Sequence, residues 1–187
     1  FNTVHNFPDE IRQITYQEAV ALDEKVDVLY LYDLPSDLEE LRLIINKVKP
    51  VNIHACFYVE NSAYLSAFPS REDFKWLYSV IWKKQVLDSR KDLNPIINAK
   101  KWHKDAVIFM LNVFSELEFV NINNGLIQLN KSPQKKDLQE AIVYQERLKQ
   151  REVEKLLYYS TYEELLRWFQ DCMGQMENLK EEMKHGL

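Results

Sequence analysis

Residues 26–57, with the sequence VDVLYLYDLPSDLEELRLIINKVKPVNIHACF, decide the fold class because a helix pattern lies between two strand patterns. Val26–Tyr32 is rich in β-branched and aromatic residues, and Asp33-Leu34-Pro35 ends this strand, since proline cannot continue a hydrogen-bonded ladder. The helix begins with a capping box at Ser36, and its apolar residues recur at i, i+3, i+7 and i+10. A second buried strand follows at residues 51–59. The segment therefore predicts two strands joined by a helix, which is typical of parallel sheets.

The residues before this segment extend the same alternation of strands and helices. Ile11–Ile14 is predicted to be a short strand, and Thr15 and Glu18 form a capping box that starts a helix ending near Asp23. We therefore expect an α/β fold class, with a small, Rossmann-like, parallel three-stranded β-α-β layer in residues 1–69.

Longer helices characterise the next part of the chain. Ser70 is predicted to cap a helix that ends near Lys84, and Asn94-Pro95 is predicted to start a short helix ending near Lys100. The helix predicted at residues 102–117 is apolar on nearly all sides, so we expect it to be largely buried.

A β-hairpin is predicted after these three helices. Residues 119–122 and 126–129 have strand composition and flank Asn123-Asn124-Gly125, where Asn-Gly tolerates the positive φ angles of a tight turn. Three helices followed by a hairpin is the element order of a winged helix, so residues 70–136 are predicted to form a winged-helix-like subdomain. Residues 137–187 are predicted to form C-terminal helices that pack on the preceding parts, with a break near Ser160.

The overall composition is that of a globular protein. Of the 187 residues, 46% are hydrophobic and 28% are charged, and no apolar run approaches the roughly 20 residues that a membrane span needs. We therefore expect no membrane partner. Two cysteines are too few for a disulfide framework, which indicates a reducing, cytoplasmic setting.

Charge is unevenly distributed along the chain. Residues 71–136 carry 12 lysines and arginines against 7 acidic residues, a net charge of +5, while residues 1–70 and 137–187 carry net charges of −6 and −4. A basic middle suggests a surface that faces an anion, although a solvated face neutralised by its neighbours explains the same pattern.

The candidate binding residues lie in this basic middle. A winged helix can bring such residues together against phosphates, whose affinity grows with the number of cationic contacts. The candidates are Lys83, Lys84, Arg90, Lys91, Lys100, Lys101, His103, Lys104, Lys131, Lys135 and Lys136. Trp76, Tyr78, Trp82 and Trp102 are interleaved with them, which suits single-strand stacking or capture of an acidic, aromatic peptide, with core packing as the alternative. Nucleic-acid contact, protein binding and plain solubility all stay open.

No catalytic constellation is evident. The chain has no glycine-rich phosphate loop and no GxSxG nucleophile motif, and its four histidines form no metal-ligand pair. Asp33, His54 and Cys56 are the remaining candidates for an unrecognised site, but a histidine within a strand is more often a structural residue of the sheet. From these residues we predict no catalytic residue, no metal ligand and no cofactor in this chain.

Three sequence segments carry a resemblance to a known family. They are residues 26–57, SREDFKWLYSVIWKK at residues 70–84 and EVEKLLYYSTYEELLRWF at residues 152–169. Together they resemble the C-terminal region of the RecJ single-stranded-DNA-specific exonucleases, in the form found in low-GC Gram-positive bacteria. The resemblance extends from about Phe7 to Gln170.

The resemblance implies a parent enzyme that degrades single-stranded DNA from 5' to 3' in recombination and repair, with Mn²⁺ or Mg²⁺ in its catalytic part. The Asp-His-His motif of that catalytic part is absent here, so no catalytic residue is carried over and the isolated chain is expected to be inactive. We expect it to be an accessory domain whose partners are the catalytic core of the same polypeptide, the acidic C-terminal tail of single-stranded-DNA-binding protein and, as an alternative, single-stranded DNA. A stand-alone nucleic-acid-binding module is the other interpretation.

Overall fold

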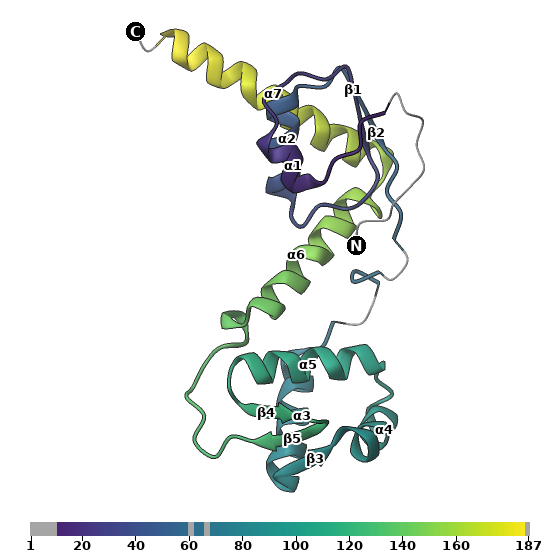
Figure 1. The fold of residues 1–187 in the computed structure, drawn as a ribbon, viewed down its shortest axis with the longest axis vertical. Coiled ribbons are helices and arrows are strands. Elements are labelled where there is room, and N and C mark those ends of the chain that lie inside the picture. Colours follow the sequence, from purple (N-terminus) through teal and green to yellow (C-terminus); the bar gives the residue numbers. More distant parts are fainter. Residues whose placement is uncertain (1–10, 60–61, 66–67, 186–187) are drawn as a thin grey trace. The chain divides into compact units, whose positions relative to one another are not determined.

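The computed structural model describes residues 11–59, 62–65 and 68–185, and the chain forms two compact units (Figure 1). Unit 1 comprises residues 1–62 and 149–187, and unit 2 comprises residues 63–148. The predicted division into three parts, with boundaries after residues 69 and 136, stays a prediction. The C-terminal segment contributes to both hydrophobic cores, because Tyr144 packs in unit 2 and Phe169 is buried in unit 1.

Unit 1 is built around a parallel pair of strands. It contains α1 (Tyr16–Ala21), β1 (Val28–Leu31), α2 (Leu38–Val48), β2 (Asn52–Ala55), the end of α6 (Ile142–Leu157) and α7 (Tyr162–His185). Val28 of β1 pairs with Asn52 of β2, and Leu31 pairs with Ala55, with α2 as the crossover between the strands. The mixed α/β class is thereby confirmed, although β2 is shorter than the strand predicted at residues 51–59.

The strand predicted at Ile11–Ile14 is wrong. These residues form no strand, and within the described part of the chain β1 pairs with β2 alone, so the parallel layer has two strands there instead of three. The physical reason lies in the spacing of the segment. Its two isoleucines are three residues apart, whereas a half-buried strand needs apolar residues at every second position.

The cap of α2 lies one residue later than predicted. Asp37, not Ser36, is the N-cap, and its carboxylate accepts a hydrogen bond of 2.8 Å from the amide of Glu40. Ser36 instead donates its hydroxyl to the Glu40 carboxylate at 2.7 Å. Both residue types suit a helix start, so composition alone does not choose between them. Asp37 also forms an ion pair of 3.1 Å with Lys149 of α6.

Replacement of Asp37 by alanine is expected to lower the free energy of unfolding by about 1 kcal/mol at neutral pH. The Glu40 amide, and then Lys149, hold the pKa of Asp37 below its usual value of 3.8. A carboxylate whose pKa is lowered by folding stabilises the fold above its unfolded pKa, and this contribution is lost as the pH falls through the folded pKa. Urea unfolding measured from about pH 7 to about pH 2 tests this. Asp37→Asn keeps a hydrogen-bond acceptor at the cap and should lose less stability than Asp37→Ala. If Asp37→Ala and the parent chain have the same free energy of unfolding near pH 7, the assignment of Asp37 as the N-cap is contradicted.

Unit 2 combines helices with a small antiparallel sheet. Its elements are α3 (Arg71–Lys84), β3 (Val86–Asp88), α4 (Ser89–Lys100), α5 (Lys104–Glu116), β4 (Val120–Asn123), β5 (Leu126–Leu129), the short 3-10 helix η1 (Leu138–Glu140) and the start of α6. The start of α3 is confirmed, since Ser70 and Asp73 form the expected capping box. The sheet has the order β3-β5-β4.

The helix predicted to start at Pro95 begins earlier. Asp88 caps α4 at Ser89 and accepts a hydrogen bond of 3.0 Å from the amide of Arg90, so Pro95 lies inside the helix. Proline has no amide hydrogen, which leaves the Lys91 carbonyl without its usual helical donor. The cap at Asp88 is sufficient to start the helix before this interruption.

Two further differences concern α5 and β3. The helix α5 is buried on one side only, since Ile108 is 38% exposed, whereas burial on nearly all sides was expected. The hairpin of β4 and β5 is confirmed, with positive φ angles at Asn124 and Gly125. β3 is not predicted from the sequence, because a strand of three residues gives no measurable alternation of apolar and polar positions.

Gly125→Ala is expected to lower the free energy of unfolding by about 1–2 kcal/mol, the cost of a left-handed backbone for a residue with a Cβ atom. Gly125 has a φ of +83°, and an added Cβ would lie 3.0 Å from the hydroxyl oxygen of Ser89. Gly174→Ala is the matched control, because Gly174 lies in α7 with no atom within 4 Å of an added Cβ. Alanine is the better helix former, so this control should be neutral or stabilising by up to about 1 kcal/mol. Chemical denaturation gives the free energy of unfolding of both variants. If Gly125→Ala unfolds with the same free energy as the parent chain, the described turn geometry is contradicted.

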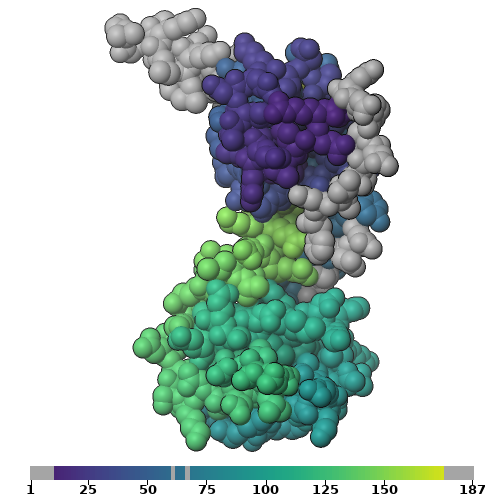
Figure 2. Space-filling model, viewed as in Figure 1, coloured from purple at the N-terminus to yellow at the C-terminus, as the bar shows by residue number. Residues whose placement is uncertain are grey.

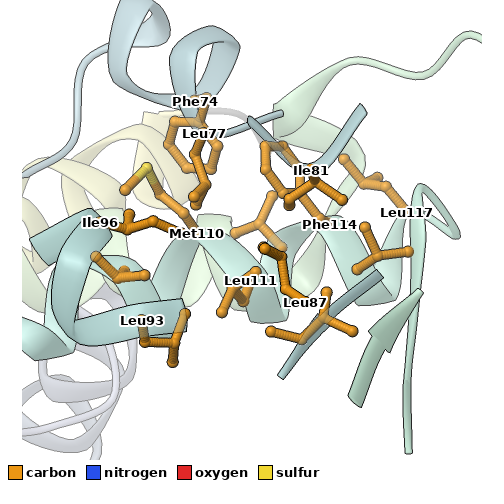
Figure 3. Close-up of a cluster of buried hydrophobic side chains, with 14 of the residues drawn as sticks. Phe74, Leu77, Ile81, Leu87, Leu93, Ile96, Met110, Leu111, Phe114 and Leu117 are labelled. Atoms are coloured by element: carbon orange, nitrogen blue, oxygen red, sulfur yellow. The ribbon is translucent and has the colours of Figure 1, made fainter. Parts of the chain in front are cut away.

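The core of unit 2 holds its helices and sheet together. Figure 3 shows side chains from α3, α4 and α5 converging with Leu87 of β3. Leu77, Ile81, Leu87 and Met110 have no exposed surface. This packing fixes the ends of α3, α4 and α5, which carry most of the candidate binding residues.

Candidate partner-binding surface

The eleven predicted cationic residues lie in three groups at different places in unit 2. Group one lies where α3 ends and α4 begins, group two lies at the junction of α4 and α5, and group three follows the hairpin. Group one is Lys83, Lys84, Arg90 and Lys91; group two is Lys100, Lys101, His103 and Lys104; group three is Lys131, Lys135 and Lys136.

Group one is tied to the hairpin turn. Lys84 forms an ion pair of 2.6 Å with Asp92, and this hydrogen bond holds the pKa of Asp92 below its usual value. The amide of Ser89 donates a hydrogen bond of 2.8 Å to the carbonyl of Gly125. The guanidinium of Arg90 lies close to the same glycine, with its Nε 3.8 Å from the position of an added Cβ. Arg90 is therefore the cation nearest the tip of the hairpin in this group.

Group two has one lysine bound to aromatic rings. The ammonium of Lys100 lies 4.9 Å from the ring centre of Trp76 and 5.7 Å from that of Trp102, and the two rings meet edge to face at 5.3 Å. Hydrogen bonding by Ser70, with smaller effects of Lys100 and Trp102, lowers the pKa of Asp73 beside them. Cation–π contact engages Lys100 and the faces of both rings within the fold. Of the two interpretations, packing within the fold is therefore the one that describes Trp76 and Trp102.

Group three lies in the loop that follows β5. Lys136 forms an ion pair of 3.1 Å with Glu118, just beyond the end of α5. Asn130 anchors the start of the loop, because its amide donates to the carbonyl of Phe119 at 3.0 Å and its side chain donates to the carbonyl of Glu118 at 2.8 Å. Lys131 and Lys135 are exposed. Among the described residues, ion pairs occupy only Lys84 and Lys136 of the eleven candidates.

The three groups do not form one continuous cationic site. Groups one and two lie at opposite ends of α4, whose 12 residues span about 18 Å, and groups two and three lie at opposite ends of α5, whose 13 residues span about 20 Å. These separations exceed the roughly 8 Å over which exposed charges act at physiological salt. Group two therefore acts separately from the other two.

An exposed aromatic surface lies between group three and the α3 end of group one. Trp82 is 54% exposed, and its ring lies 6.4 Å from that of Tyr78, which lies 5.9 Å from that of Phe119. We call these three rings, together with Lys83, which follows Trp82 in the sequence, and Lys131, which follows the Asn130 that is hydrogen-bonded to Phe119, the Trp82 surface. The amide of Leu129 donates to the carbonyl of Gln85 at 3.0 Å, which brings the end of β5 beside the end of α3.

The chemistry of the Trp82 surface suits an acidic ligand with an aromatic or aliphatic side chain. An exposed indole provides a large apolar contact area, and tryptophan is enriched among residues that dominate binding energy. Partial burial raises the pKa of the Tyr78 hydroxyl, so Tyr78 is neutral near pH 7 and supports Trp82 without adding charge. Lys83 and Lys131 are exposed and supply the cationic rim.

Phe119 is not among the residues predicted to bind a partner, because its sequence context predicts only a strand. Phe119 precedes β4 and packs partly buried against the core of unit 2. Its ring supports Tyr78, and its carbonyl holds Asn130 in front of Lys131. The sequence offers one signal for Phe119. It lies next to an acidic residue, Glu118, at the edge of the basic segment.

The residues of the alternative site lie in or just after the two parallel strands, with His54 in β2, Asp33 after β1 and Cys56 after β2. The ring of His54 stacks on that of Tyr30 at 4.9 Å, and Cys56 is an exposed free thiol. The described residues bring together no group of three histidine, cysteine, aspartate or glutamate side chains that could hold a metal ion. In the same part of the chain, no helix is long and apolar enough to cross a membrane.

Two comparisons with known proteins identify the family. The family model described as "Single-strand DNA-specific exonuclease, C terminal domain" matches residues 3–169. The chain is also 32% identical over 158 residues to the single-stranded-DNA-specific exonuclease RecJ of Bacillus subtilis (strain 168), and this match covers 84% of the chain but 20% of that relative. No solved structure matches the chain. Because the family model covers most of the sequence, the chain belongs to the family of C-terminal domains of single-strand-DNA-specific exonucleases.

Proposed function

We propose that this chain is a non-catalytic accessory part of a RecJ-type exonuclease, which degrades single-stranded DNA from 5' to 3' in recombination and repair. Membership of the family of C-terminal domains supports this, as does the match to a fifth of the length of the RecJ relative. Hydrolysis with Mn²⁺ or Mg²⁺ would take place in another part of the enzyme. The chain positions that part on its substrate through contacts of its own.

Unit 2 is proposed to work as a winged-helix-like module. Three helices, α3 to α5, precede the hairpin, and β3 completes a sheet of order β3-β5-β4. In such modules the third helix and the hairpin form the usual nucleic-acid surface. Here the exposed residues of α5 include one lysine, Lys104, at the start of the helix, Ile108 one turn later, and Glu116 at the end. The Glu116 carboxylate accepts hydrogen bonds from two amides at the start of α6. This composition favours a protein partner over base readout.

The favoured partner is the acidic C-terminal tail of single-stranded-DNA-binding protein. The observation that carries this proposal is the half-exposed indole of Trp82 next to Lys83, while the other aromatic rings of the basic segment pack into unit 2. An acidic tail complements the lysines, and an apolar side chain of the tail fits against Trp82. A partner of this kind brings the exonuclease to DNA that is already single-stranded.

Isothermal titration calorimetry with the tail peptide tests this function. We expect binding heat at low salt that weakens as salt is added, because the lysine contacts are exposed and screened. A peptide with its acidic residues replaced by serine is the control and should bind much more weakly. Absence of heat with the acidic peptide at low salt would contradict the proposal.

Non-specific binding of single-stranded DNA is the second candidate function, and group two favours it. Lys101 and Lys104 are exposed near Trp102 at the start of α5, outside the Trp82 surface. Binding should then weaken with salt at a log–log slope near −0.7 for each neutralised phosphate. Charge reversal at Lys100, Lys101 and Lys104 should weaken binding of an oligothymidylate, and an unchanged affinity would eliminate this surface.

A further inference from the structure

The backbone of β1 has one side that pairs with no other described strand. The amide of Asn52 donates to the carbonyl of Asp27 at 3.0 Å, and the amide of Cys56 donates to the carbonyl of Leu31 at 2.8 Å. Because successive residues of a strand direct their backbone groups to opposite sides, those of Val28 and Tyr30 face away from β2. On that side they form no hydrogen bond with another described residue.

A cavity of about 540 Å³ lies along this free edge. Its opposite wall is the segment before α1, where a third strand was predicted but none forms, and residues of α1 and α2 complete its lining. Figure 2 shows the residues of this segment and of α1, in dark purple, at the surface of unit 1. The cavity therefore lies between β1 and the segment that was predicted to be the third strand.

Three large side chains that line the cavity, two from β1 and one from the opposite wall, are incompletely covered. Ile14 is 37% exposed, Val28 is 40% exposed and Tyr30 is 49% exposed. Parallel sheets are normally covered on both faces, and an isolated two-stranded sheet is only marginally stable in water. The sheet of unit 1 is therefore open at an edge that is suited to accept another strand.

The rim of the cavity is acidic. Of the described residues that line it, Glu18, Glu24 and Asp33 are acidic and Arg12 alone is cationic. Arg12 forms an ion pair of 2.6 Å with Glu24, which leaves a net negative rim. An extended segment with alternating apolar residues and a lysine or arginine complements both the backbone and the charge of this edge.

We propose that the free edge of β1 binds an extended, apolar and basic segment from another part of the exonuclease polypeptide, which pairs with β1 as a third strand. This inference rests on the proposed function, because it requires the chain to be one part of a longer enzyme. The match covers 20% of the RecJ relative, so a member of this family has ample polypeptide to supply such a segment. The contact would hold unit 1 against the catalytic part, separately from the Trp82 surface.

Hydrogen exchange measured by mass spectrometry and NMR on the isolated chain and on the longer polypeptide tests this docking. The amides of Val28 and Tyr30 should exchange about tenfold or more slowly in the longer polypeptide. The amides of Leu29 and Leu31, which face β2, serve as the internal reference and should be protected in both. Equal exchange of the outward amides in both forms would overturn the proposal, whatever the result of the peptide titration at Trp82.

Proline variants separate this edge from general effects on the sheet. Val28→Pro removes an outward amide of β1 and spares the ladder with β2, so it should abolish the added protection of Tyr30. Ala55→Pro is the matched control, since it removes an outward amide from the free edge of β2 and should leave that protection intact. If circular dichroism shows Val28→Pro to be unfolded, Tyr30→Lys replaces it and should also abolish the added protection, measured at Val28, because the new cation repels a basic segment.

Other occupants of the edge give distinct results. A chain that starts at Ile11 is compared with the full chain. If the amide of Val28 loses protection on this shortening, residues 1–10 occupy the edge, and the proposal is contradicted. Protection that appears only at high concentration, together with a dimer in sedimentation experiments, would assign it to a second copy and contradict the proposal as well.

Discussion

Trp82→Ala is expected to weaken binding of the acidic tail peptide by about 30-fold or more, the loss that a central aromatic anchor of about 2 kcal/mol produces. Trp82 is 54% exposed and stands over Tyr78, so its removal takes away the apolar contact and leaves the lysines in place. Calorimetry at constant salt gives the affinity ratio directly. The salt dependence of the residual binding should match that of the parent chain, because the same lysines remain.

Tyr162→Ala is the matched control for this prediction. Tyr162 is 73% exposed at the start of α7 in unit 1, so its replacement removes a comparable exposed ring outside the Trp82 surface. We expect this variant to bind the peptide as the parent chain does. If Trp82→Ala keeps the affinity of the parent, or if Tyr162→Ala loses as much, the Trp82 surface is not the binding site.

Phe74→Ala is expected to lower the free energy of unfolding by about 3–5 kcal/mol, the usual cost of removing a buried phenylalanine. Phe74 is 2% exposed, and its ring meets those of Phe114 at 5.6 Å, Tyr144 at 6.0 Å and Phe109 at 6.1 Å. A total stability of about 5–15 kcal/mol is typical of proteins, so this one change removes a large part of it. The midpoint of urea unfolding of unit 2 should fall accordingly.

Ile108→Ala provides the comparison for the core. Ile108 lies on α5 but is 38% exposed, so its truncation leaves little cavity and should cost less than about 1 kcal/mol. If the two variants unfold at the same urea concentration, the packing of α3 against α5 and α6 is not as described. Peptide binding by the folded fraction of both variants should be unchanged.

Local chemistry explains which parts of the fold are predictable from the sequence. Ser70 and Asp73 cap α3 as predicted, and Asn124-Gly125 forms the turn of the hairpin, because in each case two or three adjacent residues suffice. The strand wrongly predicted at residues 11–14 and the missed β3 are the opposite case, because strand formation depends on pairing with residues far along the chain. β3 pairs with β5, about 40 residues later, and no local pattern reports such a partner.

The candidate site is predictable in its composition but not in its arrangement. The sequence identifies the lysines and the aromatic rings of the basic segment, but the lengths of α4 and α5 separate the lysines into three groups. Trp76 and Trp82 have similar lysine-rich surroundings in the sequence, yet Trp76 packs against Trp102 and Lys100 while Trp82 is exposed. Only the packing of α3 on its neighbours decides which face of that helix is buried.

A nuclease assay on the isolated chain tests the central claim most directly, namely that this polypeptide recruits and positions an enzyme whose chemistry lies elsewhere. The purified chain is incubated with a 5'-labelled single-stranded oligonucleotide and Mn²⁺, and the products are separated by electrophoresis. We predict no shortening of the oligonucleotide, while the same preparation still binds the acidic tail peptide. Degradation that disappears when Asp33, His54 or Cys56 of this chain is replaced would contradict the account.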